Sequence, residues 1–186
     1  VGLLEIFISR SYLLNSRIDA KIMAYYALLT WIYDSFNTIP YLRAMGEAGA
    51  GKSELMRRVG LVCYRLMMAN GAGTAASLFR SVERYRGTVF IDEADLAQSD
   101  TTNDIIKFLN LGAMRNNPIW RLEEVIGADG RKEFVERMYT TFCPKLIAMR
   151  RDFRDDAVGS RSLTFKIQPR ETMELLAAKV PLEINN

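Results

Sequence analysis

Apolar residues are concentrated in two stretches near the start of the chain. The segment Val1–Phe36 predicts two helices, and the second begins at about Ile18, with Asp19 in its first turn. Apolar positions in this second helix are nearly continuous, so we expect burial on most sides, with core positions for Met23, Tyr25, Tyr26 and Trp31. The break at Asn37–Pro40 ends the helical segment.

After this break, short β-rich apolar runs alternate with amphipathic stretches. The pattern predicts strands at Tyr41–Ala44, Thr88–Ile91, Leu146–Met149 and Leu163–Ile167. It predicts helices from Lys52 to about Leu66, over Thr74–Arg84 and over Thr102–Met114. Such alternation favours an α/β sandwich with a mainly parallel central sheet.

Two further β-rich runs break the alternation. The runs Ile119–Val125 and Lys132–Tyr139 flank the sequence Gly127-Ala128-Asp129-Gly130, which is typical of a hairpin turn. The expected hairpin lies between the helix at Thr102–Met114 and the strand at Leu146–Met149. It is therefore an insertion in the α/β pattern.

Composition narrows the classes of function. The 186 residues are 49% hydrophobic and 25% charged, with a formal net charge of +3, which does not by itself indicate a nucleic-acid partner. The absence of histidine excludes Ser-His-Asp triads, histidine general bases and most catalytic zinc sites. Two widely separated cysteines fit a reducing cytosol, so we expect a cytoplasmic protein. The longest apolar run, Ile22–Tyr33, is too short to span a membrane.

The strongest motif follows the first predicted strand. Residues 46–53 match the pattern GxxxxGK[ST] in full, between an expected strand and an expected helix. The glycines let backbone N–H groups converge on phosphate oxygens, Lys52 reaches the β- and γ-phosphates, and the Ser53 hydroxyl can ligate Mg²⁺. Glu54, which follows the motif in the expected helix, is included among the predicted contacts. The predicted ATP contacts are therefore Gly46, Glu47, Ala48, Gly49, Ala50, Gly51, Lys52, Ser53 and Glu54.

Two acidic residues end the predicted strand at Thr88–Ile91. Asp92 and Glu93 fall at its carboxyl edge, where ligands of parallel sheets usually bind. We expect Asp92 to hold Mg²⁺ and Glu93 to polarise the attacking water. An apolar run that ends in acids is weak evidence alone, but 40 positions after Lys52 it makes a specific pair with the loop.

Together, the loop and the segment Val89–Asp95 (VFIDEAD) resemble an AAA+ ATPase over about Tyr41–Ile167. The resemblance implies a three-layer P-loop sandwich with N-terminal helices at 1–40, an ATPase core at 41–168 and the start of a truncated helical lid at 169–186. It also implies a homo-oligomeric ring, such as a hexamer, and an arginine finger at Arg161 that acts on a neighbouring subunit. Within this superfamily, the chain most resembles the ATPases of phages, plasmids and other mobile elements, which are often joined to primase or helicase modules.

The chain departs from this family at two points. The segment Pro144–Met149 resembles the strand before the first sensor, but Arg150 and Arg151 stand where a polar Asn, Thr or Ser is usual. The sequence leaves open whether Arg150, Arg151 or neither contacts the γ-phosphate, and Arg150 is taken as the candidate. The residues after Glu171 are too few for the lid that normally carries a second sensor arginine.

The hairpin is similar to one that several ring helicases insert before the first sensor. Under that resemblance its tip residues Arg131 and Lys132 contact phosphates of a threaded strand, with DNA as the candidate polymer. An ordinary surface hairpin with a solvated turn explains the same pattern equally well, since Glu123, Glu124 and Asp129 lower its charge.

Two classes of function follow. The first is an ATP-hydrolysing motor, a DNA helicase, translocase or replication-associated ATPase. The second is a switch in which ATP binding orders an oligomer or recruits a partner protein without translocation. A small-molecule kinase is less favoured, because a kinase needs no residue that activates water.

Overall fold

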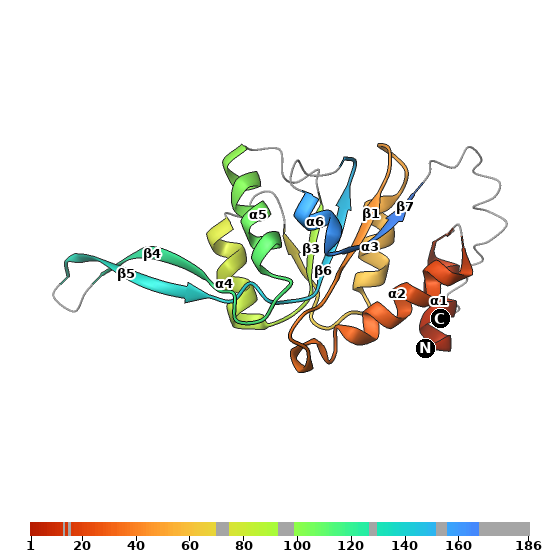
Figure 1. The fold of residues 1–186 in the computed structure, drawn as a ribbon, viewed down its shortest axis with the longest axis horizontal. Coiled ribbons are helices and arrows are strands. Elements are labelled where there is room, and N and C mark those ends of the chain that lie inside the picture. Colours follow the sequence, from red (N-terminus) through yellow and green to blue (C-terminus); the bar gives the residue numbers. More distant parts are fainter. Residues whose placement is uncertain are drawn as a thin grey trace, which may run out of the picture.

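A computed structural model describes residues 1–12, 14, 16–69, 75–92, 99–126, 130–151 and 156–167 of the chain. Figure 1 shows the arrangement of its elements. The helices are α1 (Gly2–Ser11), α2 (Arg17–Leu29), the 3-10 turn η1 (Tyr33–Ser35), α3 (Lys52–Gly60), α4 (Ala75–Tyr85), α5 (Ser99–Leu111) and α6 (Asp156–Ser160). The strands are β1 (Tyr41–Met45), β2 (Met67–Ala69), β3 (Val89–Asp92), β4 (Ile119–Ile126), β5 (Lys132–Tyr139), β6 (Lys145–Met149) and β7 (Ser162–Lys166).

The central sheet has five strands in the order β2-β3-β6-β1-β7, and all neighbouring pairs are parallel. This confirms the predicted α/β fold with a mainly parallel sheet. Because the strands are parallel, their carboxyl ends lie at one edge. The register aligns Met45 at the end of β1 with Met149 of β6, and Asp92 at the end of β3 with Ala148 of β6.

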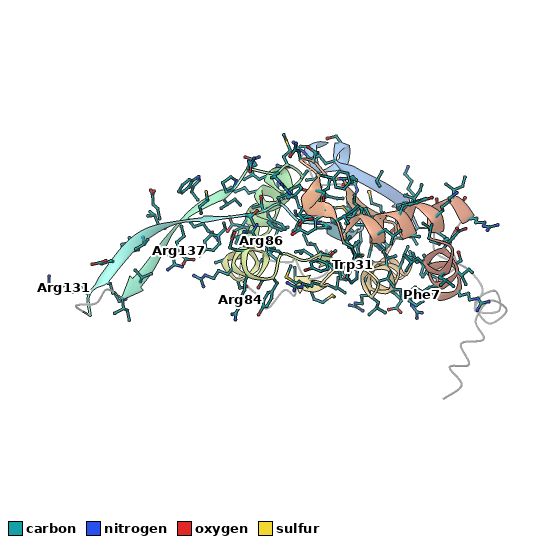
Figure 2. The ribbon with its side chains drawn as sticks, turned by 90° about the horizontal axis from the view of Figure 1, so that it is seen from below. Phe7, Trp31, Arg84, Arg86, Arg131 and Arg137 are labelled. Atoms are coloured by element: carbon teal, nitrogen blue, oxygen red, sulfur yellow. The ribbon has the colours of Figure 1, made fainter. Side chains whose placement is uncertain are left out.

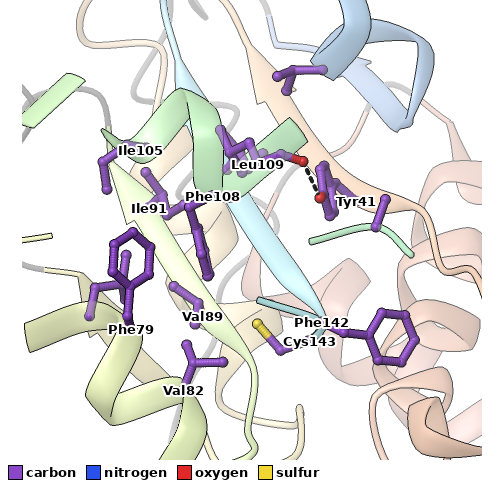
Figure 3. Packing of buried hydrophobic residues seen from close by; sticks show 14 of the residues in the cluster. Tyr41, Phe79, Val82, Val89, Ile91, Ile105, Phe108, Leu109, Phe142 and Cys143 are labelled. Carbon is purple, nitrogen blue, oxygen red and sulfur yellow. Dashed lines mark hydrogen bonds between the residues drawn. The ribbon is translucent and has the colours of Figure 1, made fainter. Parts of the chain in front are cut away.

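Both faces of the sheet are buried. Successive side chains of a strand point to opposite sides, and on each side they join an apolar cluster. On β3, Val89 and Ile91 join one apolar cluster and Phe90 joins the other. The first cluster lies under α4 and α5, where Phe79 and Phe108 pack with their ring centroids 5.8 Å apart (Figure 3). The second lies under α1, α2 and α3. The result is three layers, with helices on each side of the sheet.

The N-terminal helices pack on the second of these faces. Ser16 caps α2 by accepting a hydrogen bond from the Ile18 amide at 3.1 Å. Within α2, Tyr26 is buried, and its hydroxyl donates to the Lys145 carbonyl at 2.9 Å and accepts from the Lys145 amide at 3.0 Å. These bonds fix α2 to the first residue of β6. In the part of the chain that the structure describes, no helix is long and apolar enough to cross a membrane.

The prediction that Tyr25 and Trp31 are core residues is wrong. Tyr25 is 52% exposed and Trp31 is 59% exposed, whereas Met23 and Tyr26 are buried as expected. Trp31 lies just past the end of α2, where its indole N–H donates to the Val62 carbonyl at 3.1 Å. The apolar run is continuous, but α2 has only one face against the sheet, so the residues on its other faces stay exposed.

Helix α3 also ends before the predicted position. It stops at Gly60, and the chain turns back through residues 61–65 into β2, an edge strand that the sequence pattern did not predict. The turn is fixed from α2, because the Thr30 hydroxyl accepts from the Tyr64 amide at 2.9 Å. Arg65 then adopts a positive φ of 45°, which no helix tolerates. A long-range contact therefore sets this boundary.

The predicted hairpin is confirmed as a separate two-stranded sheet, β4–β5, that projects from the body (Figure 1). Its base is held by polar contacts with the helices. Glu123 accepts from Arg80 of α4 at 2.7 Å and from the Tyr139 hydroxyl at 2.6 Å, and Arg121 pairs with Asp104 of α5 at 2.9 Å. These contacts lower the pKa of Glu123, chiefly through the Tyr139 and Arg80 hydrogen bonds.

Candidate nucleotide-binding site

The phosphate loop, residues Gly46–Ser53, connects the carboxyl end of β1 to the first turn of α3. Gly46 begins the loop, and its amide donates to the Met149 carbonyl at 3.3 Å. A Cβ at Gly46 would lie 2.0 Å from the backbone oxygen of Ile167, so only glycine fits between β1 and the end of β7. The first glycine of the motif is therefore required by backbone packing, in addition to any ligand.

The later glycines give the loop its curvature. Gly49 and Gly51 have φ values of 76° and 85°, a region that residues with a Cβ rarely adopt. Gly51 is also the N-cap of α3, and the first helical hydrogen bond runs from the Leu55 amide to the Gly51 carbonyl at 3.0 Å. The amides of Lys52, Ser53 and Glu54 thus precede the helical bonding pattern and carry the positive end of the helix dipole. This is a cradle suited to an anion.

Lys52 is buried at the start of α3, with 7% of its surface exposed. Its ammonium donates to the Glu47 carbonyl at 2.6 Å, which closes the loop on itself. The Glu47 carbonyl also accepts from the Ala50 amide at 3.3 Å. These bonds hold the lysine charge inside the curve of the loop, where a phosphate would sit.

Sequence reasoning did not predict a contact from the N-terminal helices to this loop. Tyr12, the C-cap residue of α1, donates its hydroxyl to the Ala50 carbonyl at 2.6 Å. The same ring lies over Gly51, where an added Cβ would be 2.6 Å from the Tyr12 hydroxyl oxygen. Tyr12 and Ala50 are 38 positions apart. No periodicity or motif in the sequence links them.

The loop forms one wall of a cavity of about 310 Å³ at the carboxyl edge of the sheet. The predicted residues that line it are Ala48, Gly49, Gly51, Lys52, Ser53, Glu54, Asp92 and Arg150. The structure therefore brings together the loop, the end of β3 and the residue after β6, as the parallel topology requires. Arg57 of α3 also lines the cavity and was not predicted. Its place one helical turn after Ser53 is the signal that could have identified it.

The oxygen donors in this cavity fit a magnesium ion held mainly by phosphates. Ser53 supplies a hydroxyl and Asp92, which is 9% exposed, supplies a carboxylate. Among the described residues, no group of three or more acidic or cysteine side chains forms a metal cage. Ser53 and Asp92 fit Mg²⁺, which commonly takes one or two protein oxygens and completes its shell with water and phosphate.

Arg161 lies at the amino end of the parallel strands, whereas the cavity lies at their carboxyl end. Its carbonyl accepts from the amide of Tyr41 at 2.9 Å, so it is level with the first residue of β1, whereas the phosphate loop follows the last. The length of β1 separates them by roughly 13 Å at ~3.3 Å per residue. The guanidinium donates to the Ala157 carbonyl at 3.0 Å and reaches Asn110 at 3.5 Å. Arg161 does not enter the cavity of its own chain.

The other predicted site residues lie away from the cavity or outside the described residues. Glu93 and the segment 169–186 fall outside the described residues. Arg131 is exposed at the tip of the hairpin (Figure 2), far along the molecule from the phosphate loop. Lys132 forms an ion pair with Glu124 across the hairpin, at 2.7 Å.

The chain is similar to known proteins in its fold and not in its sequence. No protein-family profile and no curated protein sequence matches this chain. A crystal structure of JCV helicase with a bound acetamide compound aligns with a TM-score of 0.55 at 13% identity, over 91% of this chain and 46% of that chain. The structure of C. elegans PCH-2 aligns with a TM-score of 0.51 at 14% identity, over 91% and 47%. The chain thus spans about half the length of these neighbours and shares with them an α/β fold that has a mainly parallel central sheet.

Proposed function

We propose that this chain is an ATP-binding and ATP-hydrolysing AAA+-type motor that works as a homo-oligomer, with DNA as the polymer it moves on. The observation that carries the proposal is the cavity in which the phosphate loop, Asp92 and Arg150 meet at one sheet edge. An accidental glycine-rich turn would not be followed by a helix N-terminus that faces a buried acid. The fold of the two solved neighbours is consistent with this reading.

Different residues of the site are proposed to bind the phosphates, to hold Mg²⁺ and to activate water. Loop amides and Lys52 bind the β- and γ-phosphates, and Arg150 and Arg57 add positive charge at the mouth of the cavity. Ser53 and Asp92 would hold Mg²⁺, which neutralises charge on the phosphates when it is bound. Glu93 follows Asp92 directly in sequence and is the proposed group that accepts a proton from the attacking water.

Arg161 is proposed to complete the site of a second subunit. It lies beyond the reach of its own cavity, at the amino end of β1 and β7. A cation that stabilises charge on the γ-phosphate can come from a neighbouring subunit, and such a finger raises turnover by about 10³ to 10⁵. A single chain is therefore expected to bind ATP and to hydrolyse it slowly, with turnover that rises as protein concentration rises.

A mixing experiment tests this arrangement. The variants Lys52→Ala and Arg161→Ala should each be nearly inactive as ATPases, because one lacks the phosphate contact and the other lacks the finger. Mixed together, they should regain turnover at interfaces that pair an intact loop with an intact Arg161. The matched control is Arg84→Ala, an exposed arginine on α4 that lies outside the cavity. A mixture no more active than its components would refute the shared site.

A second experiment tests hydrolysis within one subunit. Glu93→Gln should bind a fluorescent ATP analogue with ordinary affinity but hydrolyse ATP about 10² to 10⁴ times more slowly. Lys52→Ala should lose the binding itself. If Glu93→Gln turns over ATP at the unmodified rate, the assigned role of Glu93 is wrong.

The switch is a second candidate, and the hairpin favours it. Residues 119–139 contain four basic and five acidic side chains, and Lys132 is already paired with Glu124. A near-neutral hairpin is poorly suited to hold phosphates. ATPase rates measured with single-stranded DNA, double-stranded DNA, RNA and no polymer separate the two candidates. The motor predicts stimulation by a polymer that Arg131→Glu with Lys132→Glu removes, and the switch predicts none.

A further inference from the structure

The hairpin has two different faces, which its register defines. Directly opposite residues of an antiparallel pair point to the same side. One face carries the pairs Arg121–Arg137 and Glu123–Val135 and turns toward α4 and α5 at its base, as the Glu123–Arg80 contact demonstrates. The other face, called here the outward face, carries the pairs Trp120–Met138, Leu122–Glu136, Glu124–Phe134 and Ile126–Lys132.

The outward face is largely apolar and exposed. Its large apolar side chains have exposed fractions of 56–77%, namely Trp120 65%, Leu122 67%, Ile126 77%, Phe134 71% and Met138 56%. At about 150–250 Å² for a fully exposed large side chain, they present roughly 500–800 Å² of apolar surface. Ordinary monomers rarely leave that much apolar surface contiguous, whereas a standard interface covers about 800 Å² on each partner.

The charged and apolar residues of the outward face occupy matching positions on either side of one row of the hairpin. Phe134 and Glu124 form the middle row, and Lys132 and Glu136 lie on β5 one row to either side of Phe134. On β4, Ile126 and Leu122 lie one row to either side of Glu124 in the same way. Successive rows on one face are ~7 Å apart. The face is therefore complementary to a copy of itself that is turned end for end.

We propose that the outward face docks on the outward face of a second copy of this chain, with the two hairpin tips pointing in opposite directions. In this isologous pair a two-fold axis passes through the middle row. Phe134 packs on Phe134, Ile126 packs on Leu122 of the second copy, and Lys132 meets Glu136 of the second copy. The two sheets would lie ~10 Å apart, as stacked sheets do.

The other relative orientation of the two copies is unfavourable. With both tips pointing the same way, Leu122 would face Glu136 and Ile126 would face Lys132, which buries charges against apolar side chains. In the proposed orientation the two Glu124 carboxylates come near each other at the axis, and each Lys132, which is 2.7 Å from Glu124 in its own chain, is shared between that carboxylate and Glu136 of the second copy. The hairpin projects from the body (Figure 1), and none of the residues in this pairing lines the cavity.

A nucleic-acid strand fits this face less well. Two of its three charged residues are acidic, and the one lysine is paired. Exposed aromatic rings can stack on bases, but single-strand binding also needs a positive groove to follow the phosphates. The same apolar rows need no such charge when they pack on a second copy. The pairing proposed here does not depend on ATP hydrolysis.

Charge exchange tests the pairing and its direction. In Glu136→Lys both symmetric contacts become Lys–Lys, and in Lys132→Glu both become Glu–Glu, so each variant alone should dimerise at least tenfold more weakly than the unmodified chain. An equimolar mixture restores both contacts, and sedimentation should detect a one-to-one heterodimer. Because the mixture rescues assembly, misfolding of a single variant cannot imitate the result.

Phe134→Glu tests the apolar centre and should give a monomer when sedimentation is measured without nucleotide, so that assembly across the ATP site does not contribute. Its matched control is Leu61→Glu, which changes a side chain of nearly equal exposure, 72%, on the body and should dimerise normally. Three outcomes overturn the proposal: an unmodified chain that stays monomeric at about 100 µM, a Phe134→Glu variant that still dimerises, or a mixture that restores nothing. A Phe134→Glu variant that loses binding of single-stranded DNA while the dimer persists would assign the face to nucleic acid instead.

Discussion

Lys145 is the most informative single position for stability. It begins β6 and is fully buried, and its ammonium donates to the carbonyls of Gly112, Thr141 and Cys143 at 3.1, 2.8 and 3.1 Å. The ammonium also lies 4.4 Å from the ring centroid of Phe108. Burial lowers the pKa of Lys145. The lysine therefore joins the end of α5 to the segment that leads from the hairpin into the sheet.

We predict that Lys145→Met destabilises the chain by about 3–5 kcal/mol. Methionine fills a similar volume but donates no hydrogen bond, and each buried carbonyl that loses its donor costs about 1–3 kcal/mol. Removing the buried ammonium recovers part of that loss. The carbonyls belong to the backbone, so the substitution cannot remove them as well. For a chain of this length the midpoint of thermal unfolding should fall by about 6–20 °C.

Urea and thermal unfolding measure this effect directly. The matched control is Lys107→Met, since Lys107 has a side chain that is 71% exposed and should change stability by no more than about 0.5 kcal/mol. A Lys145→Met variant within about 1 kcal/mol of the unmodified chain would refute the reasoning. That result would mean that water or other donors satisfy the three carbonyls.

Three further predictions follow from the site and the core. Gly46→Ala should abolish binding of a fluorescent ATP analogue, because its Cβ would collide with the Ile167 carbonyl at 2.0 Å; normal affinity would contradict this packing. Tyr12→Phe loses one hydrogen bond to the phosphate loop, so it should weaken ATP binding several-fold in the same titration while the midpoint of thermal unfolding falls only slightly. Unchanged affinity would show that this hydrogen bond does not support nucleotide binding. Burial raises the pKa values of Cys63 and Tyr33 to about 12, from 9.0 and 10.0. Their contribution to stability is thus complete below pH 9 and is lost as pH rises toward 12, which urea unfolding from pH 8 to 11 should detect as a falling free energy of unfolding.

The local motifs could be predicted because their signals lie within a few residues. The glycines at 46, 49 and 51, with Lys52 and Ser53, form one continuous pattern whose backbone demands are specific. Asp92 lines the cavity because a buried strand that ends in an acid delivers that acid to the carboxyl edge of the sheet. The hairpin was predicted from alternation and its turn residues.

Boundaries and exposure could not be predicted in the same way. The end of α3 depends on Thr30, which holds the Tyr64 amide from another helix. Tyr25 lies in an apolar run yet is exposed, because hydrophobicity along a sequence does not state which face of a helix meets the sheet. Both errors have one cause, since each outcome is decided by a neighbour distant in sequence.

The sequence by itself determined the alternation of strands and helices, the mainly parallel sheet and the position of the phosphate loop, since these follow from local conformational preference and the period of apolar residues. Only the tertiary structure decided that Tyr12 reaches the loop, that Lys145 is satisfied by three distant carbonyls and that Arg161 lies across the sheet from its own cavity. It also revealed which hairpin face is left uncovered. Such facts depend on which segments meet in space, and chain connectivity fixes that only when the whole core packs together.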